Sequence, residues 1–154
     1  EVALDMSLVR DILFTPEIWE RCAEDNVDKD SFYPATDSMA IWLVCIEDDD
    51  IIGLILVQTE TSVSIQIHPY LKADFRQKGR DMMTELYRWI LENTNVAKVN
   101  TVIPVNHQKV INFAKKMGYK KEGLSRESYQ LNGRLYDRQM LGITRSEIEV
   151  FLDG

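Results

Sequence analysis

The sequence predicts an α+β domain with α/β-like crossovers, in which helices flank a mixed, mostly antiparallel central sheet. Two hairpins and two helices support this. A pair of apolar strands meets at the acidic turn Glu47-Asp48-Asp49-Asp50, and a second pair meets at Asn132-Gly133. Between them, two amphipathic helices each connect strands. The predicted order, α-α-β-β-β-α-β-α-β-β, excludes a doubly wound parallel sheet.

Length and composition predict one soluble domain spanning 1–154. Of the 154 residues, 45% are hydrophobic and 28% are charged, and no apolar run reaches membrane-spanning length. We expect a cytoplasmic protein, because no signal peptide is recognisable. Cys22 and Cys45 lie in apolar patterns that indicate buried free thiols, and the histidines and cysteines lack metal-ligand spacing.

The charge is unevenly distributed along the chain. Residues 1–50 hold 14 acidic and 3 basic side chains, whereas residues 51–154 hold 11 acidic and 15 basic ones. This division indicates either solvated faces or two surfaces with different ligands. The basic cluster Lys115-Lys116-Lys120-Lys121 lacks the interleaved aromatics of a nucleic-acid platform, so we expect no nucleic-acid partner.

Hydrophobic spacing and capping signals predict the individual elements. Thr15-Pro16-Glu17 is a helix start, with a hydroxyl cap followed by proline. The predicted helices are Ser7–Leu13, Thr15–Glu24, Asp81–Leu91 and Gln108–Met117, with a final turn or two at Ser146–Leu152. The predicted strands are Ala40–Ile46, Ile51–Thr59, Ser62–Leu71, Lys98–Pro104, Ser125–Leu131 and Leu135–Ile143. In the third strand, Val63, Ile65 and Ile67 should face one side, and Ser64, Gln66 and His68 the other.

The segment Leu71–Asp81 carries the clearest chemical signal. It is basic, has a glycine at its bend, and leads from a strand into the best-defined helix. Backbone N–H groups and the positive field of a helix N-terminus together form a cradle for phosphate. A basic turn of this kind is also common as plain solvated surface.

This segment resembles the acetyl-CoA pyrophosphate loop of the GNAT superfamily, R/Q-x-x-G-x-G/A. Arg76 and Gly79 match the pattern, whereas Asp81 stands where a small residue is usual. An acid there reduces the positive field, although it suits the first turn of a helix.

A second stretch is similar to the later helix of the family, N-x-x-A-x-x-x-Y-x-x-x-G-F. Gly118 and Tyr119 fit its end, Asn106 lies one place early, and Ala114 replaces the tyrosine. The following hairpin resembles the branch that acetylates the N-termini of ribosomal proteins. Similar stand-alone chains also occur in tailed bacteriophages.

The resemblance implies acetyl-CoA bound between two splayed parallel strands, 62–71 and 98–104. It implies a backbone N–H of Tyr70 or Leu71 on the acetyl carbonyl, because Pro69 has no N–H. The cofactor-binding residues that it implies are Tyr70, Leu71, Arg76, Gln77, Lys78, Gly79, Arg80 and Asn106.

An acetyl acceptor must lose a proton before it attacks, which calls for a base near the first splayed strand. Gln66 and His68 share the polar face there, and only His68 can take a proton. His68 could instead be an ordinary hydrogen-bonded strand residue, and Asp74 and Glu60 are weaker alternative bases. With Ala114 in place of the tyrosine acid, the candidate substitutes on the final hairpin are Ser128, Tyr129 and Tyr136.

These observations predict an N-acetyltransferase that acetylates an amine. A cationic acceptor is favoured, because the resemblance places the acidic side chains of the first third of the chain on the acceptor side: Glu20, Glu24, Asp25, Asp28, Asp30 and Asp37. The acceptor is either a small molecule or a protein or peptide amine, and a homodimer remains open. A non-catalytic binding or regulatory module of the same fold is the alternative, favoured by Asp81 and Ala114. No metal and no membrane are expected to take part.

Overall fold

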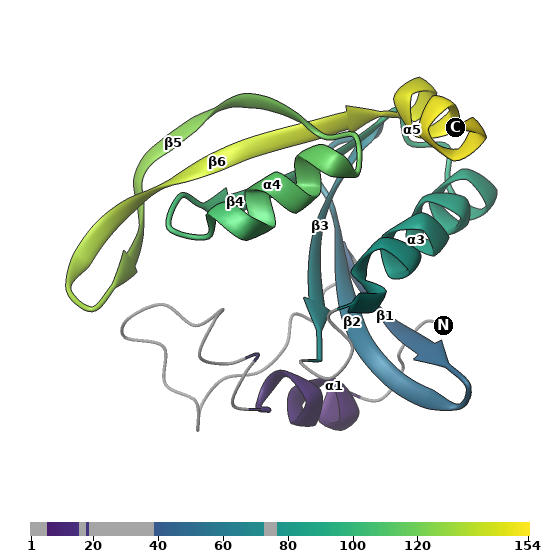
Figure 1. The fold of residues 1–154 in the computed structure, drawn as a ribbon, viewed down its shortest axis with the longest axis horizontal. Coiled ribbons are helices and arrows are strands. Elements are labelled where there is room, and N and C mark those ends of the chain that lie inside the picture. Colours follow the sequence, from purple (N-terminus) through teal and green to yellow (C-terminus); the bar gives the residue numbers. More distant parts are fainter. Residues whose placement is uncertain (1–5, 16–17, 19–38, 73–76) are drawn as a thin grey trace.

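The computed structural model describes residues 6–15, 18, 39–72 and 77–154. In this part of the chain, helices flank a six-stranded sheet of order β1-β2-β3-β4-β6-β5 (Figure 1). The helices are α1 (Met6–Leu13), α3 (Gly79–Asn93), α4 (Gln108–Lys116) and α5 (Arg145–Asp153). The strands are β1 (Ala40–Glu47), β2 (Asp50–Thr59), β3 (Ser64–Leu71), β4 (Lys98–Pro104), β5 (Lys120–Leu131) and β6 (Arg134–Thr144). The mixed, mostly antiparallel sheet with flanking helices confirms the predicted fold class.

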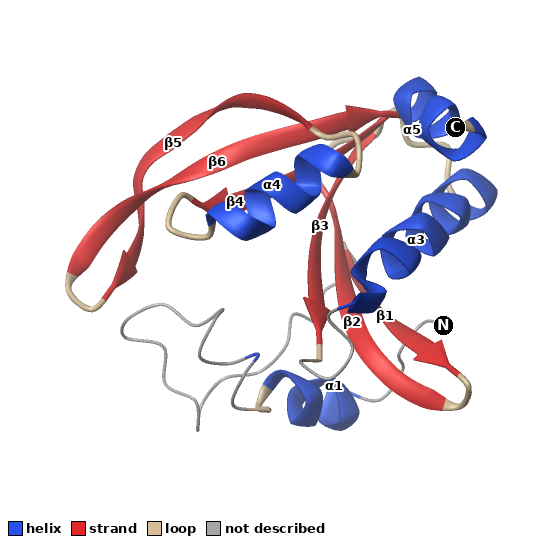
Figure 2. Ribbon diagram, viewed as in Figure 1, coloured by secondary structure: helices blue, strands red, loops and turns tan. Residues whose placement is uncertain are grey.

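The sheet is parallel at one junction, between β3 and β4. These strands pair only where Ser64–Gln66 lie beside Lys98–Asn100, and beyond those residues both strands continue without pairing with each other. All other neighbouring strands pair antiparallel along most of their length. The sheet therefore opens into a V between β3 and β4, as Figure 2 shows.

Two apolar clusters cover opposite faces of the sheet. Helices α3, α4 and α5 pack on one face, where Ile67, Tyr87, Val99 and Ile143 are almost fully buried. Helix α1 packs on the other face, against β1 and β2. Alternation of side chains along each strand produces this division, because successive residues point to opposite faces.

Most element boundaries agree with the sequence prediction to within two residues, and β4 agrees at both ends. Strand β5 is an exception, because it begins at Lys120 rather than Ser125. The first half of β5 lies at the exposed sheet edge, so its side chains carry no apolar alternation. The predicted helix at Thr15–Glu24 and the loop after it lie largely outside the described residues.

The start of β3 differs from the prediction, because the strand begins at Ser64 rather than Ser62. Val63 lies before the strand and is 54% exposed, whereas Ser64 is buried. The Ser64 hydroxyl lies 2.8 Å from the hydroxyl of Thr61, which satisfies its polarity inside the turn.

Candidate active site

The V between β3 and β4 exposes the backbone edges of both strands. In the β2–β3 ladder, Lys72 N–H donates to the Ile52 carbonyl and Glu60 N–H to that of Ser64. Alternation then directs the N–H of Tyr70 toward β2 and that of Leu71 toward the V. On the other strand, Val105 N–H donates to the Asp137 carbonyl of β6. Residues of β4 alternate between the two neighbouring strands, so the backbone N–H and C=O of Val102 point away from β6 and toward the V.

A buried hydroxyl joins the two strands at the apex of the V. Thr101, the first residue of β4 beyond the paired segment, donates from Oγ1 to the Ile67 carbonyl oxygen at 3.1 Å. Thr101 is 6% exposed and Ile67 is 1% exposed, so this bond is shielded from water. It ties β3 to β4 where their ladder ends.

Helix α3 begins beside the end of β3. Its first residue, Gly79, is buried, and a Cβ there would lie 3.4 Å from Phe113 of α4 and 3.8 Å from Leu71. Lys78 occupies the N-cap position without a side-chain cap from the described residues. Backbone N–H groups in the first turn of a helix are then left to water or an anion. The mouth of the V thus has the backbone chemistry of a phosphate site.

The charged side chains of this loop are distributed unevenly. Lys78 Nζ lies 3.0 Å from Oε1 of Glu47, which ties the loop to the end of β1. Its pKa is raised, first by the hydrogen bond to Glu47 and then by the charges of Glu47, Asp81 and Asp48. The Arg80 guanidinium lies over the Phe151 ring of α5, 5.4 Å from its centre. Gln77 is exposed, and Arg76 lies outside the described residues.

His68 and Gln66 lie side by side on the α1-facing side of β3, both half-buried. Their side chains are joined by a 3.1 Å hydrogen bond between His68 Nε2 and Gln66 Oε1. An amide oxygen can only accept, so in this pair Nε2 carries the proton and Nδ1 keeps its lone pair. Tyr70, the next residue on this face, stacks on Trp42 with ring centres 6.1 Å apart.

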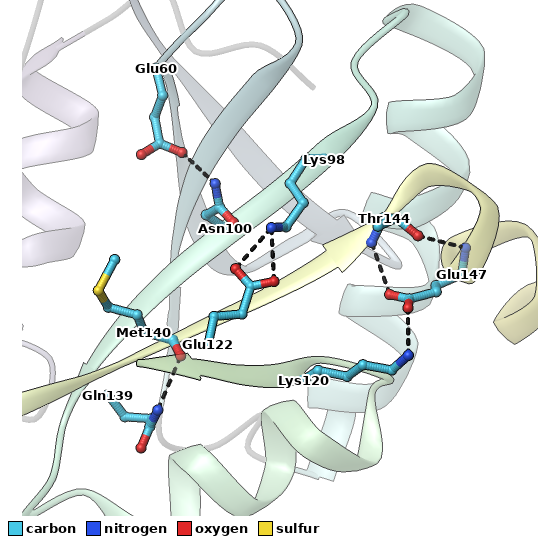
Figure 3. A network of polar contacts seen from close by, with 9 residues as sticks. All are labelled: Glu60, Lys98, Asn100, Lys120, Glu122, Gln139, Met140, Thr144 and Glu147. Carbon is cyan, nitrogen blue, oxygen red and sulfur yellow. Dashed lines mark hydrogen bonds and ion pairs between the residues drawn. The ribbon is translucent and has the colours of Figure 1, made fainter. Parts of the chain in front are cut away.

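Three influences set the protonation of His68. Burial lowers its pKa most, the charge of Arg138 on β6 lowers it further, and the charge of Glu60 raises it. Burial and Arg138 prevail, so the imidazole is neutral at neutral pH and can accept a proton. Glu60 accepts a 2.8 Å hydrogen bond from Asn100 Nδ2 of β4, as Figure 3 shows.

The later helix and the final hairpin supply fewer candidate groups. Ala114 is buried in the core, at the position where the family pattern has its tyrosine. Tyr129 is also buried, on β5 opposite Tyr136 of β6. Ser128 accepts a 2.9 Å hydrogen bond from Nε of Arg138. Asn106 is exposed in the turn between β4 and α4.

Sequence reasoning did not identify Thr101, Asn100 or Arg138. Thr101 sits among alternating apolar residues and looks like an ordinary β-branched strand residue. Asn100 bonds to Glu60 across 40 residues of sequence, and Arg138 acts from another strand, so no local pattern announces them. The sequence feature that could have drawn attention to Asn100 is that the polar residues of β4 alternate with its apolar ones and face away from the helices.

Three further expectations concern the acceptor side, metal ions and the membrane. The acidic side chains expected near the acceptor, Glu20, Glu24, Asp25, Asp28, Asp30 and Asp37, all lie outside the described residues. Within the described ranges no group of three or more His, Cys, Asp or Glu could hold a metal ion. Within the same ranges, no helix is sufficiently long and apolar to cross a membrane.

A model of the acetyltransferase (GNAT) domain matches residues 32–140, more than half of the sequence, so the chain belongs to the GNAT acetyltransferase family. This membership confirms the predicted class of enzyme, an N-acetyltransferase, and its co-substrate, acetyl-CoA. No curated protein matches the chain in sequence.

Solved structures share the fold at low sequence identity. A spermidine N-acetyltransferase from Vibrio cholerae, in complex with CoA and spermine, matches 94% of this chain and 92% of its own, with a TM-score of 0.76 and 17% identity. A SpeG variant from the same organism matches 97% and 94%, with a TM-score of 0.78 and 15% identity. A chimera of that enzyme with hSSAT matches 74% and 73%, with a TM-score of 0.68 and 19% identity.

Proposed function

We propose that this protein transfers the acetyl group of acetyl-CoA to a primary amine of a small cationic acceptor. The observation that carries this proposal is the V between β3 and β4, with the N-terminus of α3 at its mouth. An extended pantetheine arm can pair with the exposed edge of β3, and a pyrophosphate suits the first turn of α3.

Each residue near the V has a distinct proposed role toward acetyl-CoA. Leu71 is the donor to the acetyl carbonyl, because its N–H points into the V whereas that of Tyr70 points toward β2. Gln77, Lys78 and Gly79 contribute the phosphate cradle. Arg76 and Asn106 remain proposed contacts of the phosphates and the pantetheine arm, and Arg80 contributes from the side of Phe151.

The reaction requires one bond exchange and two proton transfers. The neutral amine nitrogen attacks the thioester carbonyl carbon, and the C–S bond breaks as the tetrahedral intermediate collapses. His68 Nδ1 accepts the proton that the amine loses, while Gln66 holds the ring through Nε2. The CoA thiolate takes a proton from water or from Tyr129, and a thiolate is a sufficiently good leaving group to depart without a dedicated acid.

The acceptor class follows from several supporting facts. The structural neighbour from V. cholerae was solved with spermine, and the acidic first third of this chain favours a cation. A peptide or protein N-terminus is the alternative acceptor, in keeping with the resemblance to the ribosomal-protein branch. The proposal also includes membership of that branch and a phage origin. It further includes a cytoplasmic location, a homodimer and a single domain over 1–154.

The test is release of CoA thiol from acetyl-CoA in the presence of cationic amines, measured as a function of pH. Because the pKa of His68 is lowered and the base must be neutral, kcat at saturating amine should show an acidic limb below pH ~6.5. His68→Gln should lower kcat about 100-fold or more and abolish that acidic limb. A variant that keeps both the rate and the limb would remove His68 from the mechanism.

The second candidate function is a non-catalytic module of the same fold. Lys78 is held by Glu47, Asp81 lies in the first turn of α3, and the tyrosine position of the family is buried Ala114. Such a module, with or without bound CoA, would release no thiol from acetyl-CoA in the presence of any cationic amine. The same assay therefore separates the two functions.

A further inference from the structure

We propose that Glu60, held by Asn100, is a second ammonium subsite that selects acceptors with two amines separated by a short carbon chain. The inference rests on the proposed function, because it takes the V as the acetyl-CoA site and His68 as the base. It adds a specificity-determining residue and a substrate class, the short aliphatic diamines and polyamines.

The Glu60 carboxylate is oriented toward this surface by a strand residue. Glu60 lies in the turn between β2 and β3, and Asn100 Nδ2 donates to its Oε1 at 2.8 Å. Asn100 pairs with Gln66 across the β3–β4 junction, where the V begins. An amide partner leaves the full negative charge on the carboxylate, whereas a lysine partner would neutralise it.

The nearest cation on the same strand is already occupied. Lys98 Nζ lies 2.8 Å from a carboxylate oxygen of Glu122, and Figure 3 shows this pair beside Asn100. Within the described ranges Glu60 itself forms no ion pair. As far as the described residues are concerned, the exposed Glu60 charge is therefore left for a cationic ligand on the α1 side of the sheet.

Opposite charges act on His68, which ends a polar row formed by Glu60, Asn100, Gln66 and His68. The charge of Arg138 lowers the pKa of His68, and that of Glu60 raises it, so each is close enough to act on the ring. A positive charge near the reacting amine favours its neutral, nucleophilic form, whereas a carboxylate favours the ammonium form. A diamine can place its neutral nitrogen at His68, on the Arg138 side, and its charged nitrogen at Glu60.

The strand geometry bounds the length of the acceptor. The Cα atom of Asn100, the residue that holds Glu60, lies one strand spacing across and two residues along from the Cα atom of His68, which corresponds to ~4.8 Å and ~6.6 Å. The diagonal between these Cα atoms is ~8 Å, and two nitrogens joined by three to five methylenes span a similar range, roughly 5–8 Å, when extended. A monoamine of the same length reaches His68 but leaves Glu60 without a partner.

The experiment compares 1,4-diaminobutane with n-butylamine in the thiol-release assay. The unaltered enzyme should prefer the diamine, and Glu60→Gln should raise the KM for the diamine about fivefold relative to the KM for the monoamine, because only the diamine carries a second ammonium. Glu149→Gln, which removes another exposed carboxylate, is the matched control and should leave the preference intact. Calorimetry with acetyl-CoA checks that Glu60→Gln keeps the cofactor site.

The outcomes separate this inference from the proposed function. An enzyme that binds acetyl-CoA yet acetylates neither amine refutes the proposed function, and the subsite with it. An enzyme that acetylates both amines equally well, or whose preference survives Glu60→Gln, refutes the subsite alone. A parallel rise in both KM values would show a general effect on the active site and would also overturn the subsite.

Discussion

The hydroxyl at the apex of the V provides the sharpest test of how the structure forms the cofactor site. Thr101→Val keeps the shape of the side chain and removes its hydrogen bond to the Ile67 carbonyl oxygen. Both residues are buried, so the carbonyl is left without this partner in a place that water reaches poorly. A buried polar group that loses its partner costs about 1–3 kcal/mol in the free energy of unfolding.

Two assays measure the consequence of Thr101→Val. Urea unfolding should show a lower midpoint at unchanged slope, and the melting temperature should fall by roughly 2–4 °C per kcal/mol lost. Acetyl-CoA titration should show weaker binding, because the two strands that form the V are no longer tied at its apex. Thr84→Val on α3 is the control, since its exposed hydroxyl bonds only to a carbonyl of its own helix.

Equal stability losses for Thr101→Val and Thr84→Val would refute this account of the apex. Unchanged acetyl-CoA affinity in a destabilised Thr101→Val protein would show that the bond supports the fold without shaping the site.

Three further substitutions test other parts of the structure. Gly53→Ala would place a Cβ 2.5 Å from the Tyr70 carbonyl oxygen, so it should cost about 1–3 kcal/mol in unfolding and weaken acetyl-CoA binding by shifting the end of β3. The buried Tyr119 hydroxyl lies near that of Tyr87, which already donates to the Met117 carbonyl oxygen, so Tyr119→Phe should change the unfolding free energy by no more than ~1 kcal/mol; a larger loss would contradict this reading. Glu47→Gln releases Lys78 for the phosphates, so acetyl-CoA should bind more tightly at low ionic strength and the gain should shrink in high salt; weaker binding would mean that Glu47 positions the loop.

The fold could be predicted from the sequence where local signals agree. β4 was predicted at both ends, because apolar alternation defines it, and Asn132-Gly133 located the turn between β5 and β6. The start of β5 could not be predicted, since an exposed edge strand with the sequence Lys120-Lys121-Glu122 has no apolar face to reveal it.

The site could be predicted only where its parts are close in sequence. His68 and Gln66 are two residues apart on one strand, so their shared face was visible in the alternation. The bond from Asn100 to Glu60 and the influence of Arg138 on His68 join distant segments, and they arise only when the sheet assembles. The ion pair of Lys78 with Glu47 spans 31 residues and was invisible for the same reason.

The central claim is that the V between β3 and β4 binds acetyl-CoA. Calorimetric titration of the protein with acetyl-CoA, carried out at two temperatures and repeated with CoA, tests it most directly. We expect saturable binding of one acetyl-CoA per chain, weakened in the Thr101→Val protein. Absence of binding at millimolar acetyl-CoA would contradict it, and the V would then be a structural remnant without its ligand.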